Sequence, residues 1–315
     1  MKMIGGVIDG FIDSLRICLP QSYRNLTIYP LHSNTEWGNG YMLLDDALKT
    51  KKFVVTEVDE AGNVPELKVI NQLDLDVLIL EGEELVGAKQ NRIVNASILV
   101  GQNRELVIPV SCVEHGRWQY RGKAFRSGNS SVYAQLRKKN MKSVHRNLKA
   151  SASYRADQSE IWDDIYAKEE RLSVNSETSA MNDIYKSYEK ELTEYERAFG
   201  FREEQIGFIS MINGKVIGCD IFGQSAVLQK VYKKLLRSYI LDALDDFLSG
   251  QKTPETGAEL LDKRSRNFLA DLKKAEREVY VPVGKGKDVR FKSRHLNGFV
   301  LMNDSSLVHL AAFAE

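Results

Sequence analysis

Seven short apolar runs between residues 24 and 120 restrict the fold more than any other feature of this chain. They are rich in Val, Ile and Leu and are separated by polar or glycine-containing breaks. The runs are LTIYPL (26–31), YMLL (41–44), FVVTEV (53–58), ELKVI (66–70), DVLIL (76–80), RIVNASILV (92–100) and RELVIPVSCV (104–113). Their length and composition are typical of strands, so this part of the chain is predicted to be β-rich.

The rest of the chain alternates between helical and strand patterns. Residues 128–199 are highly charged, nearly free of Gly and Pro, and carry apolar residues at helical intervals, so two or three helices are predicted there. Further on, Asn213–Gly214 between two apolar runs indicates a hairpin, and residues 225–248 form one long amphipathic pattern. We therefore predict an α+β fold packed as one unit. Its segments are a β-rich part (1–125), a charged helical region (126–200) and a hairpin–helix–hairpin part (201–315).

Composition excludes several classes of protein. The 315 residues carry a formal net charge of +1, which predicts no overall attraction to nucleic acid or membranes. The three cysteines are widely spaced and form no CxxC pattern, which is typical of a reducing compartment. No signal peptide is recognisable, and no apolar run reaches the ~18 residues that span a bilayer. We expect a cytoplasmic protein.

A polar segment, EGEELVGAKQNRIVN (81–95), lies between two apolar runs where a simple turn would be enough for folding. A hairpin around residues 101–103 would fix the register of the next two strands and give them one apolar face. Pro109 cannot donate a backbone hydrogen bond, which predicts an edge or a bulge there. Continued toward the polar segment, the register gives the opposing pairs Val94 and Val110, Arg92 and Cys112, and Gln90 and Glu114.

The buried face therefore ends in polar groups, which need partners in each other, in water or in a ligand. One interpretation is a structural ion pair between Arg92 and Glu114. The other is a binding site, with Glu114 or Glu83 as general base and Cys112 as either a nucleophile or a small core residue. The candidate ligand-binding residues are Lys89, Gln90, Asn91, Arg92, Arg117, Trp118 and Arg126.

Metal binding is an alternative role for the carboxylates of Glu81, Glu83 and Glu114, although surface glutamates are usually solvated. The histidines show no metal-ligand spacing, so no metal site is predicted and no cofactor is assigned. No GxxxxGK[ST] or GxGxxG motif is present, so the common nucleotide fingerprints are absent.

Charge is segregated along the middle of the chain. Residues 115–155 contain eleven Lys and Arg and no Asp or Glu, whereas residues 157–197 contain twelve acidic and five basic residues. The two blocks either neutralise each other or bind anions. Anion binding is expected near the strand end and at the loop RSGNSSV (126–132), which precedes a predicted helix. The basic candidates there are Arg117, Arg121, Lys123 and Arg126.

The phrases GEELVGAKQNRIVNASILV, ELVIPVSCVEHGRW, RSGNSS and QIGFISMINGKVIGCDIFG resemble the ARG- and rhodanese-phosphatase-superfamily-associated protein domain family, where ARG denotes ADP-ribosylglycohydrolase. The resemblance covers most of the chain from about residue 20 onward. It implies a link to ADP-ribose or related phosphorylated metabolites by association, and it carries no catalytic residue over to this chain.

Two functions follow as expectations. The first is binding, and if the protein is an enzyme hydrolytic processing, of a phosphorylated small molecule such as a nucleotide or an ADP-ribose derivative at the end of the 92–114 strands. The second is a non-catalytic regulatory or scaffold protein that docks a partner protein through the helices of residues 128–199. Nucleic-acid binding is a third, less favoured reading, and no membrane partner is expected.

Overall fold

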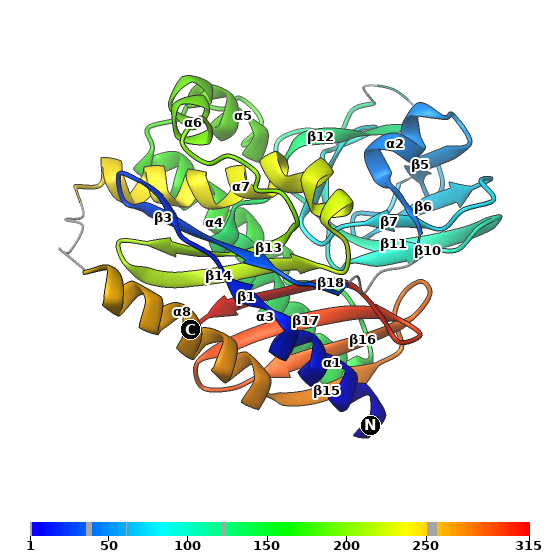
Figure 1. Cartoon of the computed structure of the whole chain (residues 1–315). Helices are drawn as coiled ribbons and strands as arrows, with labels where there is room; N and C mark the ends of the chain where they lie inside the picture. Colours follow the sequence, from blue (N-terminus) through cyan, green and yellow to red (C-terminus); the bar gives the residue numbers. More distant parts are fainter. Residues whose placement is uncertain (1, 36–39, 61, 121, 123, 251–256) are drawn as a thin grey trace. The chain divides into compact units, whose positions relative to one another are not determined.

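The computed structural model describes residues 2–35, 40–60, 62–120, 122, 124–250 and 257–315. The chain forms two compact units, and Figure 1 labels many of their helices and strands. Unit 1 contains Met1–Asn39, Lys190–Val281 and Gly286–Glu315, and unit 2 contains Gly40–Glu189 and Pro282–Lys285. Both combine helices with largely antiparallel sheets, which confirms the predicted α+β class.

The units differ from the three consecutive segments named above. Strand β3 (Leu26–His32) pairs with β13 (Gln205–Ile212), and this pairing joins the start of the chain to its last third. The β-rich segment after residue 40 and most of the charged helical region lie together in unit 2. Strand pairing between distant parts of the chain, which no local pattern reveals, sets these boundaries.

Unit 1 is built on an antiparallel sheet whose described strands run in the order β1-β3-β13-β14-β18-β17-β16-β15, with β2 also paired to β3. The predicted hairpin at Asn213–Gly214 joins β13 to β14, and these residues have φ of 50° and 71°, which Asn and Gly tolerate. The other strands are β1 (Arg16–Ile17), β2 (Gln21–Tyr23), β14 (Lys215–Phe222), β15 (Glu276–Tyr280), β16 (Lys287–Lys292), β17 (Leu296–Asn303) and β18 (Ser306–Ala314).

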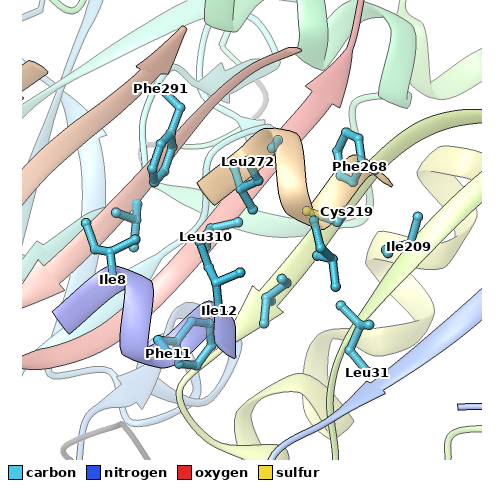
Figure 2. Close-up of a cluster of buried hydrophobic side chains, with 14 of the residues drawn as sticks. Ile8, Phe11, Ile12, Leu31, Ile209, Cys219, Phe268, Leu272, Phe291 and Leu310 are labelled. Atoms are coloured by element: carbon cyan, nitrogen blue, oxygen red, sulfur yellow. The ribbon is translucent and has the colours of Figure 1, made fainter. Parts of the chain in front are cut away.

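Helices cover both faces of the unit 1 sheet. Helices α1 (Lys2–Ser14) and α8 (Ala258–Lys274) share a buried cluster with one face, and Figure 2 shows Phe11 and Leu272 from these helices near Leu310 of β18. On the opposite face the ring of Phe208 meets Tyr239 of α7 (Ser225–Leu248) edge-on, with centroids 5.5 Å apart. The helix over 225–248 is as predicted, whereas α1 and α8 were not anticipated. Helix α6 (Glu189–Glu196) belongs to unit 1 except for its first residue.

Unit 2 holds a six-stranded sheet in the order β12-β8-β9-β11-β6-β5 and a small sheet in the order β10-β7-β4. An isolated bridge between Thr56 and Ala124 brings the two ends of the larger sheet together. The strands are β4 (Met42–Leu43), β5 (Phe53–Glu57), β6 (Glu66–Asn71), β7 (Val77–Ile79), β8 (Glu83–Gly87), β9 (Arg92–Val94), β10 (Ile98–Val100), β11 (Arg104–Cys112) and β12 (Phe125–Ser131). Its helices are α2 (Leu44–Lys49), α3 (Ala134–Ser151), α4 (Gln158–Arg171) and α5 (Met181–Ser187).

The predicted register of β9 and β11 is confirmed, since Arg92 lies opposite Cys112 and Val94 opposite Val110. The hairpin proposed around residues 101–103 is wrong, because β10 pairs with β7 and the first part of β11 pairs with β6. Pro109 lies where β11 changes its partner from β6 to β9, inside the sheet and not at its edge. Proline has no backbone N–H to donate. It is tolerated here because the position at which a strand changes its partner does not require that donor.

The segment RSGNSSV was expected to be a loop before a helix, but residues 125–131 form strand β12 on β8, with an irregular register between Ser127 and Ser131. The anion-binding site predicted from a loop at the N-terminus of the following helix is therefore not formed. Among the helices that the structure describes, none has the length and apolar character needed to cross a lipid bilayer.

Candidate functional site

Polar side chains gather where β8, β9 and β11 of unit 2 end, and almost all of them are buried. The apolar row of β9 and β11 runs inward from Val94 and Val110 and ends at Arg92 and Cys112, as strand alternation requires. Beyond the strand ends the chain turns, and the turns supply the remaining groups. Those at most 9% exposed are Lys89, Gln90, Asn91, Arg92, Glu114 and Arg117. Glu81, Glu83 and Glu84 are also buried, but the register of β8 and β9 places them toward the opposite end of β8.

Arg117 forms a buried ion pair with Glu114, in which Nε donates to Oε1 (2.8 Å) and Nη2 to Oε2 (2.7 Å). A guanidinium has five N–H groups, and those of Arg117 all have acceptors. Besides Glu114, these acceptors are the backbone oxygens of Gly87, Ala88 and Gln119 and the side-chain oxygen of Asn91. Arg117 therefore crosslinks the turns around it. Because all its N–H groups are used, it has no donor left to bind an anion, the role predicted for it from the sequence.

Glu114 is held as an ionised carboxylate. Burial would raise its pKa, but the hydrogen bonds from the Arg117 side chain and from the Asn91 backbone N–H (3.0 Å) outweigh burial and lower the pKa below its usual value. Thr178 adds a further hydrogen bond to Oε1 (3.2 Å). The cation supplied by the neighbouring turn thus keeps the pKa of Glu114 low, which does not favour the predicted role of general base.

Arg92 is the contrasting case. Its side chain is 0% exposed, and its Nη1 donates to Oε1 of Gln90 (2.9 Å). Nε and Nη2 are buried and have no hydrogen-bond partner among the residues that the structure describes. The predicted alternative, an Arg92–Glu114 ion pair, is not formed, because Glu114 binds Arg117 instead. Burial lowers the pKa of Arg92, yet a guanidinium remains protonated in proteins.

The Trp118 ring lies beside both Arg92 and Lys89, and the Tyr120 ring lies beside Lys89. The Nζ atom of Lys89 is 5.1 Å from the ring centroid of Trp118 and 5.1 Å from that of Tyr120, and it donates to the backbone oxygen of Glu60 (2.8 Å). The guanidinium carbon of Arg92 is 5.8 Å from the Trp118 ring. Because Trp118 is 45% exposed, its ring lies between two cations and the solvent, in the geometry of cation–π contacts.

Glu57 is a member of this group that sequence reasoning missed. It ends β5, its Oε1 accepts a hydrogen bond from the Lys89 backbone N–H (3.3 Å), and its buried Oε2 has no partner among the described residues. A signal was present in the sequence. Phe53, Val55 and Glu57 are the buried positions of an alternating strand, so Glu57 ends an inward-facing row as Arg92 does.

The other predicted catalytic groups are less suited to chemistry. Both oxygens of Glu83 accept hydrogen bonds, from the Leu80 backbone N–H (3.2 Å) and from the Ser127 hydroxyl (3.3 Å). Cys112 is fully buried, burial raises the pKa of its thiol, and its sulfur contacts the backbone of Glu114. A thiol of this kind is a core residue and is a poor nucleophile.

The remaining candidates can be placed as follows. Gln90 and Asn91 lie inside the cluster and orient Arg92 and Arg117, respectively. Arg126 is an exposed residue of β12, and Arg121 and Lys123 lie outside the described residues.

Within the described ranges, no three His, Cys, Asp or Glu side chains are grouped closely enough to hold a metal ion, so the alternative site at Glu81, Glu83 and Glu114 does not form.

A comparison with family models matches residues 14–313 to the domain described as the ARG and Rhodanese-Phosphatase-superfamily-associated Protein domain. No curated protein and no solved structure matches the chain. The matched range includes every residue of the strand-end cluster and the whole sheet that positions it.

Proposed function

Because the chain belongs to the ARG and Rhodanese-Phosphatase-superfamily-associated Protein domain family, we propose that unit 2 binds a phosphorylated small molecule of the nucleotide or ADP-ribose type. The observation that carries this proposal is that two buried donors of Arg92, Nε and Nη2, have no hydrogen-bond partner within the described part of the chain. Buried donors without acceptors are rare in folded proteins, and each costs about 1–3 kcal/mol. A bound phosphate would supply two acceptor oxygens in the fork geometry that guanidinium prefers.

The neighbouring groups suit the same ligand. Lys89 adds a second positive charge next to the Trp118 ring, and the half-exposed rings of Trp118 and Tyr120 offer flat surfaces on which a base can stack. Since Arg92 is fully buried, the ligand reaches it when the Trp118 side chain moves aside. Binding is better supported than hydrolysis, because Glu114 and Glu83 are both engaged in hydrogen bonds within the protein.

The alternative function, docking of a partner through the helices of residues 128–199, has less support. Part of the charge of α3 and α4 is neutralised between the two helices, where Arg146 pairs with Glu160 (3.3 Å) and Lys139 pairs with Asp164. A surface whose charges are already paired gives little electrostatic reason for a partner.

Calorimetric titration with ADP-ribose tests the proposal. Arg92→Met is expected to weaken binding at least about tenfold, since a hydrogen bond to a charged group contributes about 1.5–3 kcal/mol and 1.4 kcal/mol is a factor of ten. Arg104→Met is the matched control, because it removes an exposed arginine from the same unit that is not a candidate ligand-binding residue. Equal affinities of the two variants, or no binding of ADP-ribose or inorganic phosphate by the wild type, would refute the proposal.

A further inference from the structure

Glu57 brings an acceptor to the place where Arg92 brings donors. The Glu57 side chain is 7% exposed, and of its two oxygens only Oε1 has a partner among the described residues, the backbone N–H of Lys89. A buried carboxylate oxygen is stable when a donor reaches it, and burial without one is costly. Oε2 therefore lies ready to accept a hydrogen bond from a group that enters the site.

The two side chains belong to one place in unit 2. Both end inward-facing rows, that of Phe53 and Val55 in β5 and that of Val94 in β9, within the same six-stranded sheet. Glu57 accepts a hydrogen bond from the Lys89 backbone N–H (3.3 Å). The side chains of Lys89 and Arg92 both lie beside the Trp118 ring, 5.1 Å and 5.8 Å from its centroid, so Glu57 and Arg92 lie in one neighbourhood. No ion pair within 4.0 Å joins them in the described structure, and each keeps buried atoms without partners.

From this juxtaposition we propose that the ligand carries a hydroxyl group close to its phosphate, as sugar phosphates and other polyol phosphates do. The phosphate accepts from Nε and Nη2 of Arg92, and the hydroxyl donates to Oε2 of Glu57. This inference rests on the anion site proposed above and adds a requirement to it. Glu57 is a specificity residue, because a ligand without a hydroxyl leaves its carboxylate unpaired and is repelled by its charge.

Two simpler ligands fit the pair less well. A phosphate ester without hydroxyl groups satisfies Arg92 but places its negative charge near that of Glu57. A neutral polyol satisfies Glu57 but leaves the Arg92 donors unpaired. A hydroxylated phosphomonoester satisfies both at once, and its apolar or aromatic remainder has the Trp118 and Tyr120 rings beside it.

The test compares glycerol 3-phosphate with n-propyl phosphate, which have the same carbon chain and differ in two hydroxyl groups. At pH 8 both are dianions, because the second phosphate pKa is about 6. Titration calorimetry on the wild-type chain is expected to give about tenfold tighter binding of glycerol 3-phosphate. In Glu57→Gln the roughly tenfold preference for glycerol 3-phosphate over n-propyl phosphate should disappear, because the charged acceptor of the hydroxyl is gone while the removal of the like charge favours both esters equally.

Glutamine retains an oxygen that can accept from Lys89, so the local fold is preserved in Glu57→Gln. Equal affinity of the wild type for both esters, or a parallel loss of both in Glu57→Gln, would overturn the inference while leaving the anion site standing. The parallel loss would mean that Glu57 only supports the backbone of Lys89. Failure of the wild type to bind either ester, or an Arg92→Met variant that binds both normally, would instead remove the anion site and the inference with it.

Discussion

Arg92 and Arg117 are both buried at the same end of one sheet, and we predict that replacing Arg117 with methionine destabilises unit 2 whereas replacing Arg92 does not. Methionine retains the length and apolar volume of the side-chain stem and removes the charge. For Arg117 the change removes all five N–H donors of the guanidinium. It also leaves Glu114 buried without its cation. For Arg92 it removes one good hydrogen bond, to Gln90, and two buried donors that have no described partner.

The magnitudes follow from these contacts. Removing one member of a buried ion pair costs about 3–5 kcal/mol, so Arg117→Met should lower the free energy of unfolding of unit 2 by that amount. In Arg92→Met the lost hydrogen bond is worth about 1.5–3 kcal/mol, while relief of two unpaired donors returns about 1–3 kcal/mol each. The midpoints of these ranges are a loss of about 2 kcal/mol and a return of about 4 kcal/mol, so Arg92→Met is expected to be neutral or stabilising by about 2 kcal/mol.

Hydrogen exchange measured by mass spectrometry on peptides from β9 and β11 reports the opening free energy of unit 2 without assuming that both units unfold together. Exchange in these peptides should be much faster in Arg117→Met and unchanged or slower in Arg92→Met. Arg126→Met, which changes an exposed residue, is the control and should match the wild type. If Arg92→Met accelerated exchange as strongly as Arg117→Met, Arg92 would have to be a structural ion-pair residue, and the basis for the anion site would be lost.

Two further predictions concern pH and thiol reactivity. Since the folded-state pKa of Glu114 lies below its ordinary value of 4.5, its contribution to stability is complete above that pH and is lost as the pH falls through the folded-state value. Urea midpoints of the wild type should therefore fall below pH 4.5 more steeply than those of Glu114→Gln, and parallel slopes would contradict this. A thiol reagent should modify only the half-buried Cys18 in the native protein, because Cys112 and Cys219 are buried; rapid labelling of Cys112, located by peptide mapping, would show that its site opens readily.

Strand alternation was enough to predict part of the site. Counting outward from a hairpin at residues 101–103 placed Arg92 opposite Cys112, and the structure has that register although the hairpin itself does not form. The partner of residues 98–100 was not predictable in this way, because β10 pairs with β7, a strand some twenty residues earlier. Local periodicity fixes which face a side chain takes, whereas the neighbour of a strand depends on the packing of the whole sheet.

The distinction between the two arginines also required the structure. Glu114 and Arg117 are three positions apart and would point to opposite faces of a continuous strand. The chain leaves β11 at Cys112 and turns. This turn lets Arg117 donate to the Glu114 carboxylate from both Nε and Nη2. Glu57 was overlooked for a related reason. Its strand shows the alternation clearly, but only the bridge between Thr56 and Ala124 reveals that β5 lies near the segment of Lys89.

The buried arginines of unit 2 show why Arg92 points to a ligand. Arg117 pairs with Glu114 and Arg137 pairs with Glu81, so this fold supplies carboxylates to its interior cations. Glu57 is near enough to Arg92 to act on its charge, yet the two do not close into an ion pair. An acceptor and donors that face the same interior and stay apart cost stability in the ligand-free protein. A ligand that joins them recovers that free energy and binds the folded state alone, so it should raise the melting temperature as its concentration increases.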